Sequence, residues 1–271
     1  MAKIIIDADR RASCWPNLRE VYQHRELLGA LMYRDWRVRY AQTALGLAWI
    51  LAQPLTTVLV FALVFRAAFQ IDTGLVPYPL FAGAGIVGWQ YFAQATQQAG
   101  ASLLQAQAVI HKIYFPRLML PLSKVGGGLL DFALSLAFLL AFCLAFQVEP
   151  SWLWLLIPLW VLGLAFLSLG FGLWLSALSV RLRDMQPLAS FALQMGIYLS
   201  PVAYPSRLIP EVWHGLYFCN PMAGWLETWR GIVLGTPWPP LAWLSLLSGL
   251  LILLSGLWFF GRTERVMADL L

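Results

Sequence analysis

The chain has 271 residues, of which 60% are hydrophobic and only 11% are charged. So few charged side chains cannot cover the surface of a water-soluble globule, and the composition therefore excludes a soluble protein in favour of a membrane protein. The net charge of +5 is explained by anionic lipid headgroups and does not require a nucleic-acid partner.

The first element that the sequence predicts is a helix over residues 24–40 that lies along the membrane surface. Apolar side chains share one side of it, whereas Arg34 and Arg37 point away, which is the pattern of an interfacial amphipathic helix. Asp35 and Arg39 stand four residues apart on the apolar side, where a paired acid and base fits a protein groove better than lipid tails. We therefore expect this side to contact the rest of the fold, with lipid as the alternative.

Six membrane-spanning helices are expected, since a helix that crosses a bilayer needs about 20 mostly apolar residues. The fifth is shorter and more polar than the others. No signal-peptide core is expected before the first span, which would itself direct the chain to the membrane. The sequence predicts an all-α integral membrane protein with spans at about residues 45–65, 77–98, 120–146, 152–180, 185–204 and 241–260.

Lysine and arginine predict the orientation of these spans, because cytoplasmic segments carry the excess of both residue types. Fifteen of them lie before the first span, after the second and fourth spans, and in the tail, whereas three lie on the other face. We therefore expect a multi-pass protein of the cytoplasmic (inner) membrane with both termini cytoplasmic. Residues 1–23 are expected to form a cytoplasmic N-terminal segment, and residues 24–271 the six-span domain.

Between the second and third spans, residues 103–116 are predicted to form a short cytoplasmic helix that a proline ends. Gln107, His111 and Lys112 lie on its polar side, beside the apolar ring of Phe115. An exposed phenylalanine suits a surface that docks on a cytoplasmic partner. An ordinary connecting loop is the alternative.

Before the last span, residues 205–236 are too polar and too rich in proline to cross the membrane. They are predicted to form two short helices that dip into the outer interface. Their many tryptophans and tyrosines either close a pathway or form the aromatic belt that is common in membrane proteins.

The sequence lacks the motifs of several catalytic chemistries. It has no phosphate-binding loop, so any ATP must be hydrolysed by a separate subunit. Its three histidines lie in three different regions and indicate no metal site. The three consecutive glycines at 126–128 are typical of close helix packing.

Asp131 is the one carboxylate predicted inside a span, which makes it a functional candidate. Proton-coupled carriers usually have more than one such group. A hydrogen bond from Asp131 to a neighbouring helix is therefore the preferred interpretation.

Six sequence strings occur in a characteristic order and spacing, at residues 34–55, 110–122, 180–187, 198–205, 220–231 and 262–271. Together they closely resemble the membrane subunit of the polysaccharide ABC exporters. This type-two ABC permease family exports O-antigen of lipopolysaccharide, capsule and teichoic acid. The resemblance covers nearly the whole chain from about residue 27.

The resemblance implies a homodimer bound to two cytoplasmic ATPase subunits, with no cofactor in this chain and with ATP and Mg on the partner subunit. The short cytoplasmic helix becomes a coupling helix, and residues 205–236 become re-entrant helices. The implied ATPase-coupling residues are Gln107, His111, Lys112, Tyr114, Phe115 and Arg117. The implied residues at the entry of a lipid-diphosphate headgroup are Arg34, Arg37, Arg39, Tyr40, Leu45 and Gly46.

Aromatic residues are candidates for the lining or gate of the conduit, because sugars present apolar C–H faces that stack on aromatic rings. Six helices alone leave no room for a sugar chain, so a symmetric pair of subunits is the economical way to build a conduit. Ordinary packing is the alternative for each ring. The candidates are Trp89, Tyr91, Phe92, Tyr198, Tyr204, Trp225 and Trp229.

The sequence therefore favours the transport subunit of an ATP-driven exporter over an enzyme. Its expected cargo is undecaprenyl-diphosphate-linked polysaccharide, with O-antigen preferred over capsule and teichoic-type polymers. The alternative is a membrane-embedded transferase that acts on a lipid-linked sugar. Such an enzyme needs a clustered acid–base site, which the sequence lacks.

Overall fold

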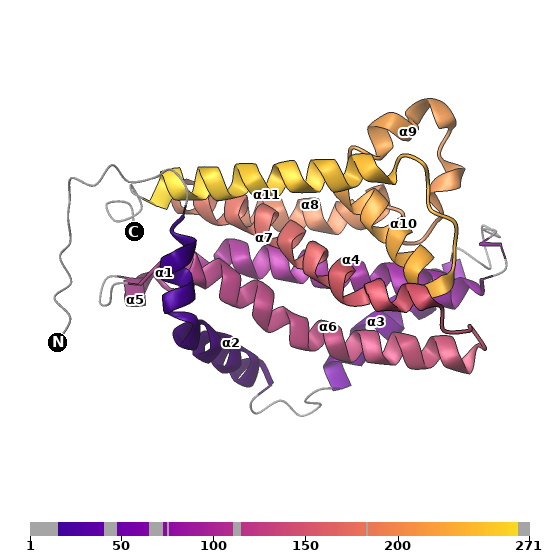
Figure 1. The fold of residues 1–271 in the computed structure, drawn as a ribbon, viewed down its shortest axis with the longest axis horizontal. Helices are drawn as coiled ribbons and strands as arrows, with labels where there is room; N and C mark the ends of the chain where they lie inside the picture. Colours follow the sequence, from indigo (N-terminus) through magenta and orange to yellow (C-terminus); the bar gives the residue numbers. More distant parts are fainter. Residues whose placement is uncertain are drawn as a thin grey trace.

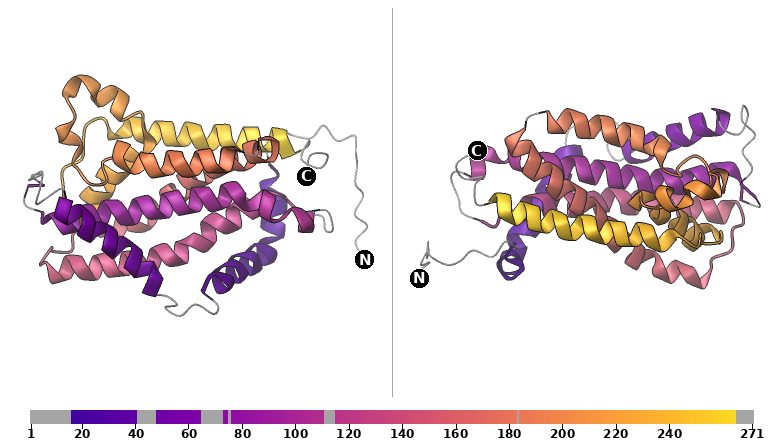
Figure 2. Two further views of the ribbon diagram at one scale, coloured as in Figure 1. Left: turned by 180° about the vertical axis from the view of Figure 1, so that it is seen from behind. Right: turned by 90° about the horizontal axis from the view of Figure 1, so that it is seen from above.

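The computed structural model describes residues 16–40, 48–64, 73–74, 76–110, 115–182 and 184–264. Within these ranges the chain is helical and contains no β-strand, which confirms the predicted all-α class. The long helices lie side by side in one bundle, with α9 near one end and α1 and α2 near the other (Figures 1 and 2).

Three of the described helices are long and apolar enough to cross a bilayer: α6 (Met119–Ala145), α7 (Ile157–Arg181) with the turn before it, and α11 (Ala242–Glu264). α3 (Ala48–Phe61) is apolar but shorter, whereas the 28-residue α4 (Tyr78–Gln105) carries five glutamines. These helices confirm a multi-pass membrane protein. The count of six spans stays a prediction.

α4 lies at the centre of the bundle and packs against both α6 and α7. Small residues bring the helices close: a Cβ on Gly172 of α7 would lie 2.5 Å from the Cβ of Ala99 on α4. Likewise, a Cβ on Gly256 of α11 would lie 2.6 Å from the carbonyl oxygen of Gly170 on α7. Such close approach maximises van der Waals contact, which drives helix association where the solvent is itself apolar.

α2 (Arg25–Tyr40) follows the short α1 (Leu18–Gln23) and packs against α6. Gly126 makes room for it, since a Cβ there would lie 2.5 Å from the terminal methyl group of Met32. The structure thus confirms that the predicted interfacial helix contacts the rest of the fold and that the run of glycines serves helix packing.

The ion pairs of α2 differ from the predicted pairing of Asp35 with Arg39. Asp35 pairs with Lys124 at 2.7 Å and with Arg34 at 2.9 Å. Arg39 pairs instead with Asp131 of α6. The reason is that α6 offers each residue a partner of opposite charge, which the spacing within one helix could not reveal.

The segment between α4 and α6 begins later than the predicted boundary at residue 103. α4 continues to Gln105 because Leu103 is fully buried in the bundle, and Ala106 then forms a turn before α5 (Gln107–Ile110). Residues 111–114 lie outside the described part of the chain. Of the predicted coupling helix, the structure therefore describes residues 103–110 and 115–116.

α8 (Met185–Leu199) ends five residues before the predicted end of the fifth span. Ser200 is extended and precedes a proline, which disfavours the helical conformation. The region predicted as two short helices contains α9 (Glu211–Tyr217) and α10 (Pro221–Leu234). The latter begins with a hydrogen-bonding asparagine cap and ends at Gly235 with φ of 72°.

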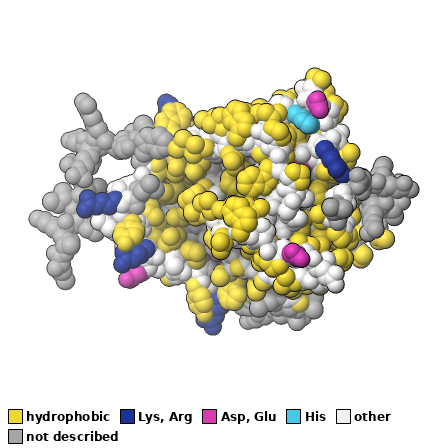
Figure 3. Space-filling model, turned by 45° about the vertical axis from the view of Figure 1, so that its right-hand side comes forward, with side chains coloured by type: hydrophobic (Ala, Val, Ile, Leu, Met, Phe, Trp, Pro, Cys, Tyr) yellow, Lys and Arg dark blue, Asp and Glu magenta, His cyan; other side chains and the backbone are white. Residues whose placement is uncertain are grey.

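The surface of the bundle is mainly apolar. Figure 3 shows hydrophobic side chains over most of the middle of one face, whereas the charged side chains in view lie toward its margins. Exposed leucines, valines and tryptophans occur on α3, α8 and α11. This distribution suits helices that are surrounded by lipid or by other membrane helices.

Candidate functional site

A cavity of about 810 Å³ opens between α2, α3, α4, α6 and α8. Ligand pockets in proteins typically measure roughly 300–1,000 Å³. The cavity is therefore large enough for a small molecule or for a segment of a longer chain. Its lining combines one ion pair, several amides and several aromatic rings.

The ion pair joins Arg39, at the end of α2, to Asp131 of α6. Arg39 also donates a hydrogen bond of 2.7 Å to the side-chain oxygen of Gln98. Asp131 is buried, and its Oδ1 atom has no hydrogen-bond partner. Burial and the neighbouring carboxylate of Asp131 raise the pKa of Tyr40 to about 12, so Tyr40 keeps its proton.

Five glutamines give the cavity an amide lining. Gln90, Gln94 and Gln97 share one face of α4, because they are spaced by four and three residues. Gln53 of α3 and Gln194 of α8 line the facing walls. Each amide group both donates and accepts hydrogen bonds, so the lining suits a neutral, hydroxyl-rich ligand.

One of these glutamines is only partly satisfied. The Nε2 atom of Gln97 donates a hydrogen bond of 3.1 Å to Gln186 on α8, but its Oε1 atom is buried without a partner. A buried acceptor left without a donor costs roughly 1–3 kcal/mol.

Three of the seven aromatic candidates line this cavity, namely Trp89, Tyr91 and Tyr198. The hydroxyl of Tyr91 is already used, because it donates to the carbonyl of Val125 at 3.1 Å. Trp49 and Phe132, which the sequence did not single out, line it as well.

The other four aromatic candidates pack elsewhere. Phe92 meets Phe171 edge to face, with the ring centroids 5.4 Å apart. Trp229 is fully buried and stacks on Trp160 at 4.2 Å, and Trp225 meets the same ring edge to face. Tyr204 donates to the carbonyl of Tyr198 at 3.1 Å. Trp229 and its neighbours therefore serve as packing.

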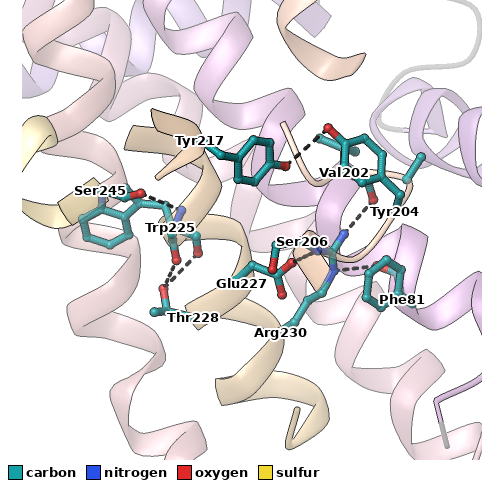
Figure 4. Close-up of polar contacts among 12 residues, drawn as sticks. Phe81, Val202, Tyr204, Ser206, Tyr217, Trp225, Glu227, Thr228, Arg230 and Ser245 are labelled. Atoms are coloured by element: carbon teal, nitrogen blue, oxygen red, sulfur yellow. Dashed lines mark hydrogen bonds and ion pairs between the residues drawn. The ribbon is translucent and has the colours of Figure 1, made fainter. Parts of the chain in front are cut away.

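A second polar cluster fastens α10 to the bundle (Figure 4). Arg230 is fully buried and donates to two carbonyl oxygens, those of Phe81 at 3.2 Å and Val202 at 2.7 Å. Its guanidinium group also lies 3.6 Å from the centroid of the Phe81 ring. One side chain thus joins α10 to α4 and to the turn after α8.

Glu227 completes this cluster. Its Oε1 atom lies 3.7 Å from Arg230 and accepts a hydrogen bond of 2.7 Å from the backbone N–H of Ser206. Nearby, the hydroxyl of Tyr217 donates to that of Tyr204 at 3.3 Å (Figure 4). The cluster fixes the path of residues 200–206 over the end of the bundle.

Comparison of the sequence with known protein families assigns the chain to one of them. The sequence profile of the ABC-2 type transporter family matches residues 26–234, which is most of the chain. The chain belongs to the ABC-2 type transporter family. Membrane permeases of this family lack ATPase activity and work with a separate ATPase subunit.

Curated relatives of this ABC-2 permease cover most of its length. It is 27% identical over 252 residues to the O-antigen export system permease protein RfbA of Klebsiella pneumoniae, which covers 91% of this chain and 95% of the relative. It is 30% identical over 217 residues to a protein of the same name from Myxococcus xanthus, covering 79% of this chain and 83% of the relative.

Among the coupling residues predicted for this permease, Arg117 has the best defined contacts. Its backbone N–H donates to Oε1 of Glu264 at 3.3 Å, and its guanidinium group donates to the Glu264 carbonyl at 2.7 Å. Gln107 is exposed and Phe115 is half-buried. His111, Lys112 and Tyr114 lie outside the described residues. Arg117 thereby holds the chain just before α6 to the end of α11.

The predicted headgroup residues of the permease fall into two groups. Arg34 and Arg37 are exposed on α2, whereas Arg39 faces the cavity. Tyr40 also lines the cavity. Leu45 and Gly46 lie outside the described residues.

The glutamines are the part of the cavity that reasoning from the sequence missed. The signal was present, because amides at positions 90, 94 and 97 repeat on one face of a largely apolar helix. The lining residues predicted from the sequence were all aromatic, so the glutamines were not among them.

Proposed function

We propose that this permease is the membrane subunit of an ATP-driven exporter that moves a lipid-diphosphate-linked polysaccharide, O-antigen in the first instance, outward across the cytoplasmic membrane. The observation that supports the proposal is the cavity in which aromatic rings and amide groups face the same space. Aromatic faces stack on sugar C–H groups and amides bond to sugar hydroxyls, so this combination suits a glycan.

The proposed assembly is a homodimer with six spans per subunit and cytoplasmic termini. In support, no residue of α8 is buried, although the helix is mainly apolar and forms one wall of the cavity. A second subunit facing α3 and α8 would cover their exposed side chains and enclose the cavity in a conduit. ATP and Mg would bind to the two ATPase subunits, with no cofactor in this chain.

For energy coupling, we propose that the ATPase contacts the segment between α4 and α6. The contacts of Arg117 with Glu264 support this role, because they would pass a displacement of the segment directly to α11. For the anionic headgroup we propose Arg34 and Arg37, which are exposed. Arg39 is unsuited, since Asp131 already neutralises it.

The test is reconstitution of the permease with its ATPase subunit in proteoliposomes that contain lipid-linked O-antigen. We expect ATP-dependent movement of the polysaccharide across the membrane, and no movement with an ATPase variant that binds but does not hydrolyse ATP. Conversion of a lipid-linked sugar by the permease alone, without nucleotide, would instead identify a membrane transferase.

A further inference from the structure

The charges that line the cavity cancel within one ion pair. Among the described residues of its lining, Arg39 and Asp131 are the charged ones, and they pair with each other. The remaining polar groups are amides and hydroxyls, which are neutral. We infer that the cavity selects an uncharged glycan and disfavours polymers that carry carboxylate or phosphate groups. This inference rests on the proposed function and narrows its cargo.

The cavity offers exposed amide groups to which a hydroxyl-bearing ligand can bond. Gln53, Gln94 and Gln194 are exposed and line the cavity from three helices. An amide accepts a hydrogen bond from a sugar hydroxyl and donates one to it, and neither bond requires a charge on the ligand. The exposed amides therefore suit a neutral glycan.

The same arrangement opposes an anionic ligand. The one cation in the described lining, Arg39, is already bonded to Asp131 and to Gln98. An anion that entered the cavity would lose part of its hydration without gaining a free cation among the described lining residues in return.

Stacking surfaces complete the site for a neutral glycan. Trp89 lies against α8, where a Cβ on Gly196 would come within 2.7 Å of its ring. Trp49 and Tyr198 are both more than half exposed at the cavity. These rings offer apolar faces to sugar C–H groups and attract no anion.

The test compares two substrates that differ by one charge. The permease and its ATPase subunit are reconstituted in nanodiscs with a tetrahexose linked to undecaprenyl diphosphate. The second substrate is the same lipid-linked tetrasaccharide with one hexose replaced by a hexuronic acid. The lipid and the diphosphate are identical, so only the glycan varies. We expect stimulation of ATP hydrolysis to reach half its maximum at an about tenfold lower concentration of the neutral substrate.

A charge variant tests whether this cavity is the origin of the preference. Gln94→Lys places a cation in the cavity and should shift the ratio of the two half-maximal concentrations about tenfold toward the acidic substrate. Gln194→Lys repeats the change on the opposite wall, in case the first variant does not fold. Gln23→Lys makes the same substitution at an exposed site on α1, outside the cavity, and should leave the ratio unchanged.

The outcomes separate the selectivity from the proposed function. Equal stimulation by both substrates, or stronger stimulation by the acidic one, would overturn the selectivity but leave an exporter of glycans. An unchanged ratio in both cavity variants would likewise overturn it. A complex that hydrolyses ATP but responds to neither substrate would contradict the proposed function, and the selectivity with it.

Discussion

Two charge pairs of this permease have opposite surroundings. Arg230 pairs with Glu227 in α10, a helix in which twelve of fourteen residues are buried. Arg39 pairs with Asp131 beside a cavity that α2 and α8 wall in part. Neither of these two helices has a buried residue among those described. The first pair joins packed elements. The second pair lies beside open space that exposed amide groups line, where a ligand can bind.

The largest effect is expected from Arg230→Met. The substitution removes two hydrogen bonds to carbonyl groups and leaves Glu227 as a buried charge without its cation. Breaking a buried pair in this way costs about 3–5 kcal/mol. The free energy of unfolding of the purified permease, measured in detergent, should fall by that amount.

Arg19→Met is the matched control for this prediction, because Arg19 is exposed on α1. It should leave the free energy of unfolding nearly unchanged. If Arg230→Met were as stable as the control, the α10 cluster would not fasten the bundle, and the contrast between the two charge pairs would lose its basis.

A smaller effect is expected at the cavity, where Arg39→Gln and Asp131→Asn should interact. Each single change leaves the other charge partly buried and unpaired, so the double variant should be more stable than the sum of the single effects predicts. We expect a coupling energy of about 1–3 kcal/mol from a double-mutant cycle of unfolding free energies. Strictly additive effects would mean that the ion pair does not hold α2 to α6.

The helices could be predicted from the sequence, because they follow from local patterns of apolar and polar residues. Two contacts could be predicted in kind. The position of Asp131 in an apolar segment correctly indicated a bond to a neighbouring helix, and the polar residues of α2 indicated contact with protein. The partner of Asp131 could not be predicted, since Arg39 lies 92 residues away and only the packing of α2 on α6 brings them together.

The aromatic candidates show the same limit. A tryptophan can have similar neighbours in the sequence whether it lines a cavity or packs in a core. The sequence could therefore not distinguish Trp89 from Trp229. In the structure Trp229 donates to the carbonyl of Ala84 and is fully enclosed, whereas Trp89 lines the cavity. Which rings face a cavity depends on how helices distant in the sequence are placed.

A third effect concerns pH and the attachment of α2. Partial burial acts to raise the pKa of Asp35, but the cations Lys124 and Arg34 outweigh it and hold the pKa below its ordinary value. A carboxylate with a lowered pKa stabilises the fold above its unfolded pKa of about 3.9, and this contribution is lost as the pH falls through the folded pKa. The contribution of Asp35 to the free energy of unfolding is therefore constant from pH 7 to about pH 5.

Asp35→Asn gives the measurement for this effect. The melting temperature of the variant should lie below that of the unmodified permease at neutral pH, by an amount that corresponds to about 1 kcal/mol. The difference should shrink below about pH 4, because Asp35 itself then becomes neutral. A difference that stayed constant down to pH 3 would show that charge is not what Asp35 contributes.

The smallest effect on stability, and the sharpest test of the contrast, is expected from Gln94→Leu. Gln94 is exposed and lines the cavity, so the free energy of unfolding should change by no more than about 0.5 kcal/mol. Export should nevertheless fall about fivefold, because a hydrogen-bonding group for the glycan is lost. Gln23→Leu, outside the cavity, should change neither quantity. A variant that lost stability and export together would place Gln94 with Arg230 among the residues that hold the fold, and the cavity would then be a packing defect.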